Sequence, residues 1–206
     1  MTLSTSYFKR SPLVIAISLA LTSPTFAVDF TIADGETETA PQTLSGTAGD
    51  NTGVIEVGGA LTTSGTAITA SGPSNTINNS GTIKATVEGI DSDGNNAIIT
   101  NSGTINAGYG IFSGGDYDII TNSGTINTGG DGIFSGGINA TITNSGTIDT
   151  DYYGIESAGD NANITNSETI NAGAAGIYSN ANADDATINN SGTIDEADFG
   201  IESDGI

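Results

Sequence analysis

The sequence predicts an all-β protein, a right-handed parallel β-helix (a β-solenoid) with about 22 residues and three short strands per coil. Two repeated phrases predict it. The first, I-x-N-S-G-x-I, recurs with its serines 21 to 24 residues apart, at Ser80, Ser102, Ser123, Ser145, Ser167 and Ser191. The second, G-I-x-S, keeps the same period, with its glycines at Gly89, Gly110, Gly132, Gly154, Gly176 and Gly200. A fixed period of this length is typical of a solenoid.

Each repeat favours strands over a helix. It is rich in Gly, Asn, Ser and Thr, and its apolar residues alternate with polar ones over short runs. This alternation turns Ile142, Ile148 and Ile155 toward the interior, with a bend at Ser145-Gly146 between the first two. A chain that returns to its start after three strands stacks its coils about 4.8 Å apart, the spacing of hydrogen-bonded strands.

Stacked coils place equivalent residues above one another. Three isoleucine ladders are therefore expected, from Ile77 to Ile188, from Ile83 to Ile194 and from Ile90 to Ile201. The asparagine of the first phrase is expected to point inward, where each amide can donate to the next one instead of remaining unpaired at a cost of about 1 to 3 kcal/mol. The glycine suits a bend with positive φ. Glu168 replaces it in "NSETI", so that bend is either strained or does not need positive φ.

The chain divides into three parts. Residues 1–27 read as a secretory signal peptide, with Lys9 and Arg10 before an apolar run and cleavage after Ala27. Residues 28–75 keep the same residue types without the period, and we expect an N-terminal cap and irregular first coils there. Residues 76–206 carry the regular repeats and end inside a unit, at "GIESDGI". We expect either a longer protein or another element that covers this edge.

Composition excludes several classes of function. Without the signal peptide, Lys84 is the only positive side chain against 24 Asp and Glu, a net charge of −23. Nucleic acid and anionic lipid are therefore not expected as partners. The chain has no Cys and no His, which excludes disulfides, Ser-His-Asp and Cys-His catalysis, and metal sites with His ligands. No cofactor is expected.

Carboxylates remain the candidates for chemistry. Asp149 with Asp151, or Asp195 with Asp198, would be the pairs for glycoside hydrolysis, but they lie on repeated turns and not in a unique cleft, so we expect no enzyme. Other carboxylates cluster with the hardness that Ca²⁺ prefers. They do not recur at one register, so we expect solvated acidic turns and no metal site. These carboxylates are Asp91, Asp93, Asp116, Asp118, Asp184 and Asp185.

Outward positions offer candidate binding residues. One column of threonines runs from Thr82 to Thr193 and suggests an ice-binding face, which needs two such threonine ranks side by side. The second rank, from Thr100 to Thr165, is expected across a turn from the first. Exposed aromatic residues on a rigid wall are instead candidates for binding glycans or protein, and packing between adjacent coils is the alternative. The candidate ligand-binding residues are Phe112, Phe134, Tyr178, Tyr109 and Tyr153.

A signal peptide followed by units of "ITNSGTI" and "GI.S" resembles the passenger region of bacterial autotransporters, over about residues 76 to 206. The resemblance implies a secreted or outer-membrane, cell-surface β-helix that acts as an adhesin without enzymatic activity. It implies host-cell or matrix glycans and proteins as partners, and a C-terminal translocation barrel if the chain is a fragment. The alternatives are a carbohydrate-active β-helix, which binds or cleaves glycans, and a cation- or ice-binding solenoid.

Overall fold

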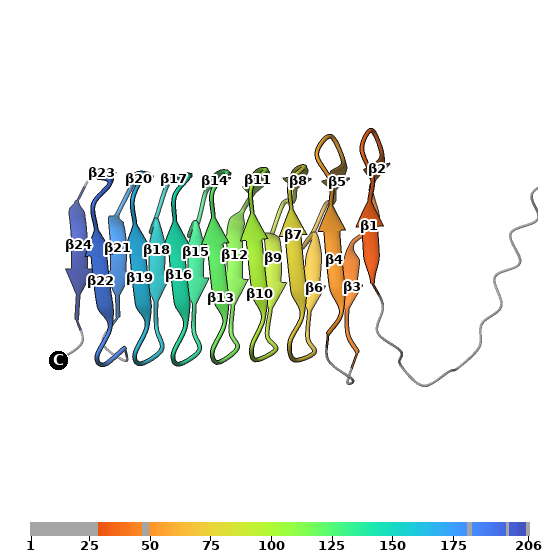
Figure 1. Cartoon of the computed structure of the whole chain (residues 1–206). Helices are drawn as coiled ribbons and strands as arrows, with labels where there is room; N and C mark the ends of the chain where they lie inside the picture. Colours follow the sequence, from red (N-terminus) through yellow and green to blue (C-terminus); the bar gives the residue numbers. More distant parts are fainter. Residues whose placement is uncertain (1–28, 47–49, 181–182, 197, 205–206) are drawn as a thin grey trace, which may run out of the picture.

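A computed structural model describes residues 29–46, 50–180, 183–196 and 198–204. The predicted signal peptide, residues 1–27, lies outside the described residues. The described residues form 24 strands and no helix, and all paired strands run parallel. The predicted fold class, a parallel β-solenoid with three strands per coil, is confirmed (Figure 1). Accordingly, no helix in the described part of the chain is long and apolar enough to cross a membrane.

The strands form three sheets, and each coil contributes one strand to each sheet. Sheet A contains β1 (Phe30–Ile32), β4 (Thr52–Ile55), β7 (Thr76–Asn79), β10 (Ile98–Asn101), β13 (Ile119–Asn122), β16 (Thr141–Asn144), β19 (Asn163–Asn166) and β22 (Thr187–Asn190). Sheet B contains β2 (Thr37–Glu38), β5 (Ala60–Thr62), β8 (Thr82–Lys84), β11 (Thr104–Ala107), β14 (Thr125–Thr128), β17 (Thr147–Thr150), β20 (Thr169–Ala172) and β23 (Thr193–Glu196). Sheet C contains β3 (Gln42–Leu44), β6 (Ile68–Ala70), β9 (Glu88–Ser92), β12 (Tyr109–Ser113), β15 (Ile133–Ser135), β18 (Ile155–Ser157), β21 (Ala175–Ser179) and β24 (Phe199–Ser203).

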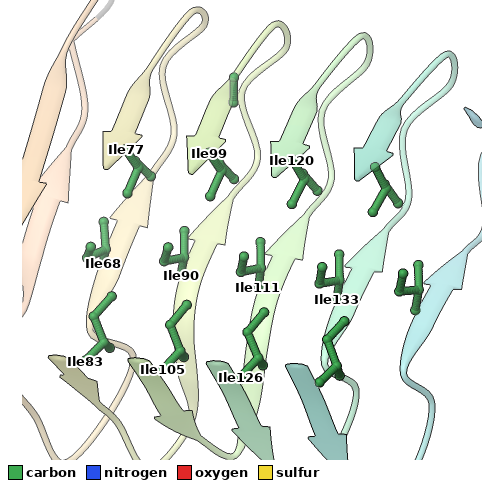
Figure 2. Close-up of a cluster of buried hydrophobic side chains, with 14 of the residues drawn as sticks. Ile68, Ile77, Ile83, Ile90, Ile99, Ile105, Ile111, Ile120, Ile126 and Ile133 are labelled. Atoms are coloured by element: carbon green, nitrogen blue, oxygen red, sulfur yellow. The ribbon is translucent and has the colours of Figure 1, made fainter. Parts of the chain in front are cut away.

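The three isoleucine ladders fill the interior as predicted. In sheet A, Ile99 pairs in register with Ile77 and with Ile120, and the equivalent isoleucines of sheets B and C pair in the same way. Figure 2 shows these side chains stacked coil above coil and pointing into one core. The interior isoleucines from Ile77 to Ile177 are at most 1% exposed, so the coils between them repeat the same apolar contacts. At the end of the ladders Ile188 and Ile194 are only partly buried and Ile201 is 48% exposed.

The inward asparagines form the predicted amide ladder. The Nδ2 of Asn101 donates to the Oδ1 of Asn122 at 2.8 Å, and the Nδ2 of Asn122 donates to the Oδ1 of Asn144 at 2.7 Å. The ladder extends from Asn79 to Asn190 with distances of 2.7 to 2.8 Å. Each of these amides therefore donates to an acceptor in the next coil, which removes most of the penalty for burying it. The exception is the Oδ1 of Asn79 at the start of the ladder, which is buried without a partner.

The glycine of the first phrase has a different role from the predicted one. Positive φ was expected at this bend, but the glycines with positive φ in the described residues are Gly35 and Gly58, so this expectation is wrong. A side chain at Gly103 would instead collide with the carbonyl oxygen of Gly81, one coil earlier. Close approach between stacked bends, and not backbone handedness, selects glycine here. The left-handed residues other than glycine lie in the turn before sheet A, at Asp50, Ser74, Asn96, Tyr117, Asn139, Asn161 and Asp185.

Residues expected to form the cap and the irregular first coils contribute strands to the same sheets. Strands β1 to β3 form the first coil and β4 to β6 the second. The register departs from the repeat at Gly53, which occupies an isoleucine position of sheet A. The ring of Phe30 lies against Gly53 and fills the space that an isoleucine occupies in later coils.

Candidate functional site

The outer face of sheet C gathers aromatic and acidic side chains on consecutive coils. Because the coils stack in register, the middle residue of each G-I-x-S phrase faces outward in one column. This column reads Asp91, Phe112, Phe134, Glu156, Tyr178 and Glu202. A second set of side chains lies three residues earlier in the chain, at Glu88, Tyr109, Asp131, Tyr153 and Phe199. We call these two sets together the sheet C strip.

Phe112 and Phe134 form a stacked pair in this strip. They pair in register on β12 and β15, and their ring centroids lie 4.6 Å apart with planes 14° apart. Since this separation matches the strand spacing, the ring faces turn toward each other along the solenoid axis. The pair therefore presents mainly ring edges to solvent, and both side chains are half-buried.

Three tyrosines form a second aromatic cluster. The rings of Tyr153 and Tyr178 stack with centroids 4.6 Å apart, and Tyr152 lies against Tyr153 at 4.2 Å with a tilt of 43°. The hydroxyl of Tyr178 donates a hydrogen bond to the Oδ2 of Asp204 at 3.0 Å, and this bond raises the pKa of Tyr178. Tyr152 keeps 48% of its surface exposed, so this cluster has an accessible ring.

Two carboxylates, the half-buried Glu156 and the buried Asp131, separate the aromatic clusters. Glu156 lies in register between Phe134 and Tyr178. Burial and the nearby charge of Asp131 raise the pKa of Glu156, and burial raises the pKa of Asp131 despite a hydrogen bond from the backbone N–H of Tyr153. These carboxylates lose hydration on folding and can accept hydrogen bonds from a ligand's hydroxyl or amide groups.

The structure thus brings together four of the five predicted binding residues, as two pairs. Phe112 lies with Phe134, and Tyr153 lies with Tyr178. Tyr109 contacts neither pair in these ring interactions; its ring lies over Gly130, and it remains 46% exposed.

Sequence reasoning did not identify Asp131 with Glu156 as a pair. The two residues occupy different positions of the repeat in successive coils, so no spacing rule connects them. The sequence does contain a usable pattern: the outward positions of successive repeats carry aromatic and acidic residues. The pattern can be recognised only after the repeats are aligned.

The carboxylate pairs proposed from the sequence lie elsewhere. All four residues, Asp149, Asp151, Asp195 and Asp198, are exposed. Asp149 lies on β17 and Asp195 on β23 of the last coil, so the expectation that these pairs lie on turns is wrong for these two residues. Asp149 aligns with Asn171 and then Asp195 along sheet B. These residues do not join the sheet C strip.

The acidic turns between sheets C and A have a structural role. The Oδ1 of Asp116 accepts a hydrogen bond from the N–H of Ile138 at 3.0 Å, one coil later. Asp160 does the same for the N–H of Asp184. Among the described residues, no group of three or more acidic side chains is placed to hold a metal ion.

The expectation of solvated turns is wrong for Asp118. Its side chain is fully buried, accepts hydrogen bonds from the Ser113 hydroxyl and from the N–H of Ala97, and aligns with alanines in the neighbouring coils. Desolvation by burial raises its pKa to about 6.

The two threonine ranks lie on different sheets, as expected. The rank from Thr82 to Thr193 faces outward on sheet B, and the rank from Thr100 to Thr165 faces outward on sheet A. The bend at the Ser-Gly pair of the first phrase separates the two ranks, so they do not form one paired flat face.

The chain matches no known family model, and neither the curated proteins nor the solved structures contain a significant match to it.

Proposed function

We propose that the chain is a non-enzymatic adhesin of the autotransporter-passenger kind, exported and presented at the cell surface, which binds ligands through the sheet C strip. One observation supports this most: aromatic rings and desolvated carboxylates share one outer face over successive coils. The interior ladders hold this face rigid, because each coil is packed and hydrogen-bonded to its neighbours.

The chemistry of the strip favours uncharged, hydroxyl-rich ligands such as neutral glycans. The half-buried carboxylate of Glu156 accepts hydrogen bonds from sugar hydroxyls, and the aromatic groups contact the apolar C–H faces of the sugar. The faces inside each ring stack are already occupied, so Phe112, Phe134 and Tyr178 contact a ligand through their outer ring edges. The exposed rings of Tyr109 and Tyr152 offer further faces for stacking. The net charge of −21 opposes anionic glycans.

Repeated weak contacts are sufficient for adhesion. The strip extends over several coils, so each ligand contact contributes little, while many copies of the chain at a surface multiply the total attachment.

The test compares two triple variants that change the same three coils. Phe112→Ser with Phe134→Ser and Tyr178→Ser alters sheet C, and Thr104→Ser with Thr125→Ser and Thr169→Ser alters the outer face of sheet B. Beads coated with each purified chain are scored for attachment to epithelial cells and to a panel of neutral glycans. Circular dichroism verifies that each variant is folded.

We expect the sheet C variant to lose attachment severalfold and the sheet B variant to retain it. Unchanged attachment of a folded sheet C variant would contradict the proposal, and so would equal losses in both variants.

A glycoside-cleaving activity is the second candidate, because burial and then the negative charge of Asp131 raise the pKa of Glu156. Glycoside hydrolysis usually needs two carboxyl groups, one with a raised pKa that acts as the general acid and one that stays ionised as the base or nucleophile. Release of reducing ends from a polysaccharide, abolished by Glu156→Gln, would favour this candidate over simple binding. No release by the wild-type chain from a panel of plant, microbial and animal polysaccharides would eliminate it.

A further inference from the structure

The outer face of sheet A differs from the rest of the surface because it carries no charge. None of its eight strands contains Asp, Glu, Lys or Arg. Sheets B and C both carry acidic residues in their strands, for example Asp149 and Glu156. In a chain with a net charge of −21, an uncharged face that runs along the whole solenoid is a distinct feature.

This face is also partly apolar at its centre. Ile98 and Ile119 pair in register on β10 and β13 and are 45% and 46% exposed. Beside them, in the turns that precede sheet A, Tyr117 is 55% and Ile138 is 39% exposed, and the N–H of Tyr117 donates to the carbonyl of Ile138. These four residues form an apolar patch on the solvent side of the central coils.

The remaining outward side chains are small and uncharged. They are mostly threonines and asparagines that repeat at the strand spacing, and they surround the patch. The outward residues of sheet A are Thr31, Thr52, Val54, Thr76, Asn78, Ile98, Thr100, Ile119, Thr121, Thr141, Thr143, Asn163, Thr165, Thr187 and Asn189.

We propose that sheet A is a self-association face, on which a second copy of this chain packs sheet against sheet. Charge supports this occupant: two such faces meet without opposing carboxylates, whereas contact through sheet B or C would bring acidic residues together. Two flat sheets with short side chains pack about 10 Å apart, as in β-sandwiches.

The borders of the face select the relative orientation of the two copies. Where the strands of sheet A begin, the turns carry Asp93, Asp116, Asp160, Asp184 and Asp185. Where the strands end, the border is the bend formed by the Ser-Gly pair of the first phrase. In the regular coils, Glu168 is the one charged residue in these bends. A two-fold axis parallel to the solenoid places the acidic border of each copy over the serine border of the other. A two-fold axis along the strands would oppose acidic to acidic borders, so the two solenoids run side by side in the same direction.

The size of the face predicts weak association. Eight strands at about 4.8 Å and four residues at about 3.3 Å per residue give a face of roughly 34 Å by 13 Å. Such a face, roughly 440 Å² on each copy, is about half of what a standard interface buries on each partner, so the dimer forms and dissociates with concentration. Salt screens the repulsion between the two acidic chains and strengthens the dimer.

Sedimentation of the purified chain over a range of concentrations, at low and at moderate salt, tests this proposal. The variant Ile98→Asp with Ile119→Asp places two carboxylates at the centre of the face. The variant Asn106→Asp with Asn127→Asp adds the same charge to the same two coils, on sheet B. Thermal unfolding verifies that both variants are folded.

We expect the wild-type chain to reach the mass of a dimer at high concentration, more readily at moderate salt. The sheet A variant should remain monomeric under those conditions, and the sheet B variant should dimerise within a fewfold of the wild type. A monomer at every concentration and salt, equal effects of the two variants, or a dimer that salt dissociates would overturn the proposal. The triple serine variant of sheet C should dimerise like the wild type, so this proposal and the adhesive function fail independently.

Spin labels then test the orientation. The chain contains no cysteine, so Ser191→Cys gives a single labelled position at the border of the last coil. Copies that run in the same direction place the two labels roughly 15 to 25 Å apart, whereas opposite directions separate them by about 34 Å, seven strand spacings. A pulsed electron spin resonance distance beyond about 30 Å in the dimer would overturn the side-by-side arrangement.

Discussion

The interior and the exterior of the solenoid follow different rules. Inside, every regular coil repeats the same isoleucines and the same asparagine, because each residue must match its counterpart one strand above. Outside, the residues at one position change from Asp91 to Phe112 and from Phe134 to Glu156 in successive coils. The repeated phrase therefore specifies the architecture, and the variable outward residues are free to specify binding.

The largest expected difference between these regions comes from one charge placed on either side of the same strand. Ile148 is fully buried on β17, and its neighbour Thr147 faces outward. Ile148→Asp should lower the free energy of unfolding by about 3 to 5 kcal/mol, because the carboxylate is buried without a partner. Thr147→Asp should cost less than about 1 kcal/mol. Chemical denaturation measures both, and similar losses would disprove the alternation of inward and outward side chains.

A smaller difference concerns the one place in the regular coils where an acidic side chain replaces an interior alanine. The pKa of Asp118 is raised to about 6 from 3.8 because burial disfavours the charged form. Between these values the folded state holds a proton that the unfolded chain has released, so this contribution to stability is present below about pH 4 and is lost as the pH rises through 6. The loss amounts to about 3 kcal/mol.

Denaturation from pH 4 to pH 7 measures this contribution. Asp118→Asn should remove most of the decline, and the smaller remaining slope reflects Asp91, Asp131 and Glu156, whose pKa values are also raised. An unchanged pH profile in Asp118→Asn would show that this carboxyl does not titrate within the folded coil.

The sequence was sufficient to predict the interior but not the surface. Period and alternation identified the ladders and the inward asparagines, because stacking forces the same residue type into every coil. The role of Gly103 was misread, because a clash with the carbonyl of Gly81 depends on how closely two bends approach, and spacing does not report that distance. The burial of Asp118 was missed for a related reason, since it breaks the pattern at a single position.

The candidate site was predictable only in part. The aromatic residues of the sheet C strip were recognisable as outward, but their mutual stacking depends on side-chain direction. The sequence already shows that the I-x-N strands, which form sheet A, contain no charged residue. This absence of charge becomes visible as a property of one face only when the strands are assigned to faces.

The smallest expected effect concerns calcium. Asp116 and Asp160 already accept backbone hydrogen bonds from the next coil. Millimolar Ca²⁺ should therefore shift the melting temperature by no more than about one or two degrees, through general screening. A larger, saturable rise with Ca²⁺ that Mg²⁺ does not reproduce would place a function in these turns and would weaken the distinction between structural turns and binding faces.

Deletion of one complete coil tests most directly whether the repeat specifies architecture. Removing residues 120–141 joins Ile119 to Ile142, which restores the register of all three sheets, whereas removing residues 120–130, half of that segment, shifts it. Circular dichroism and thermal unfolding should show that the full-coil deletion keeps its β structure and unfolds cooperatively within a few degrees of the parent chain, while the half-coil deletion is unfolded or strongly destabilised. Equal tolerance of both deletions, or loss of structure in both, would contradict the account.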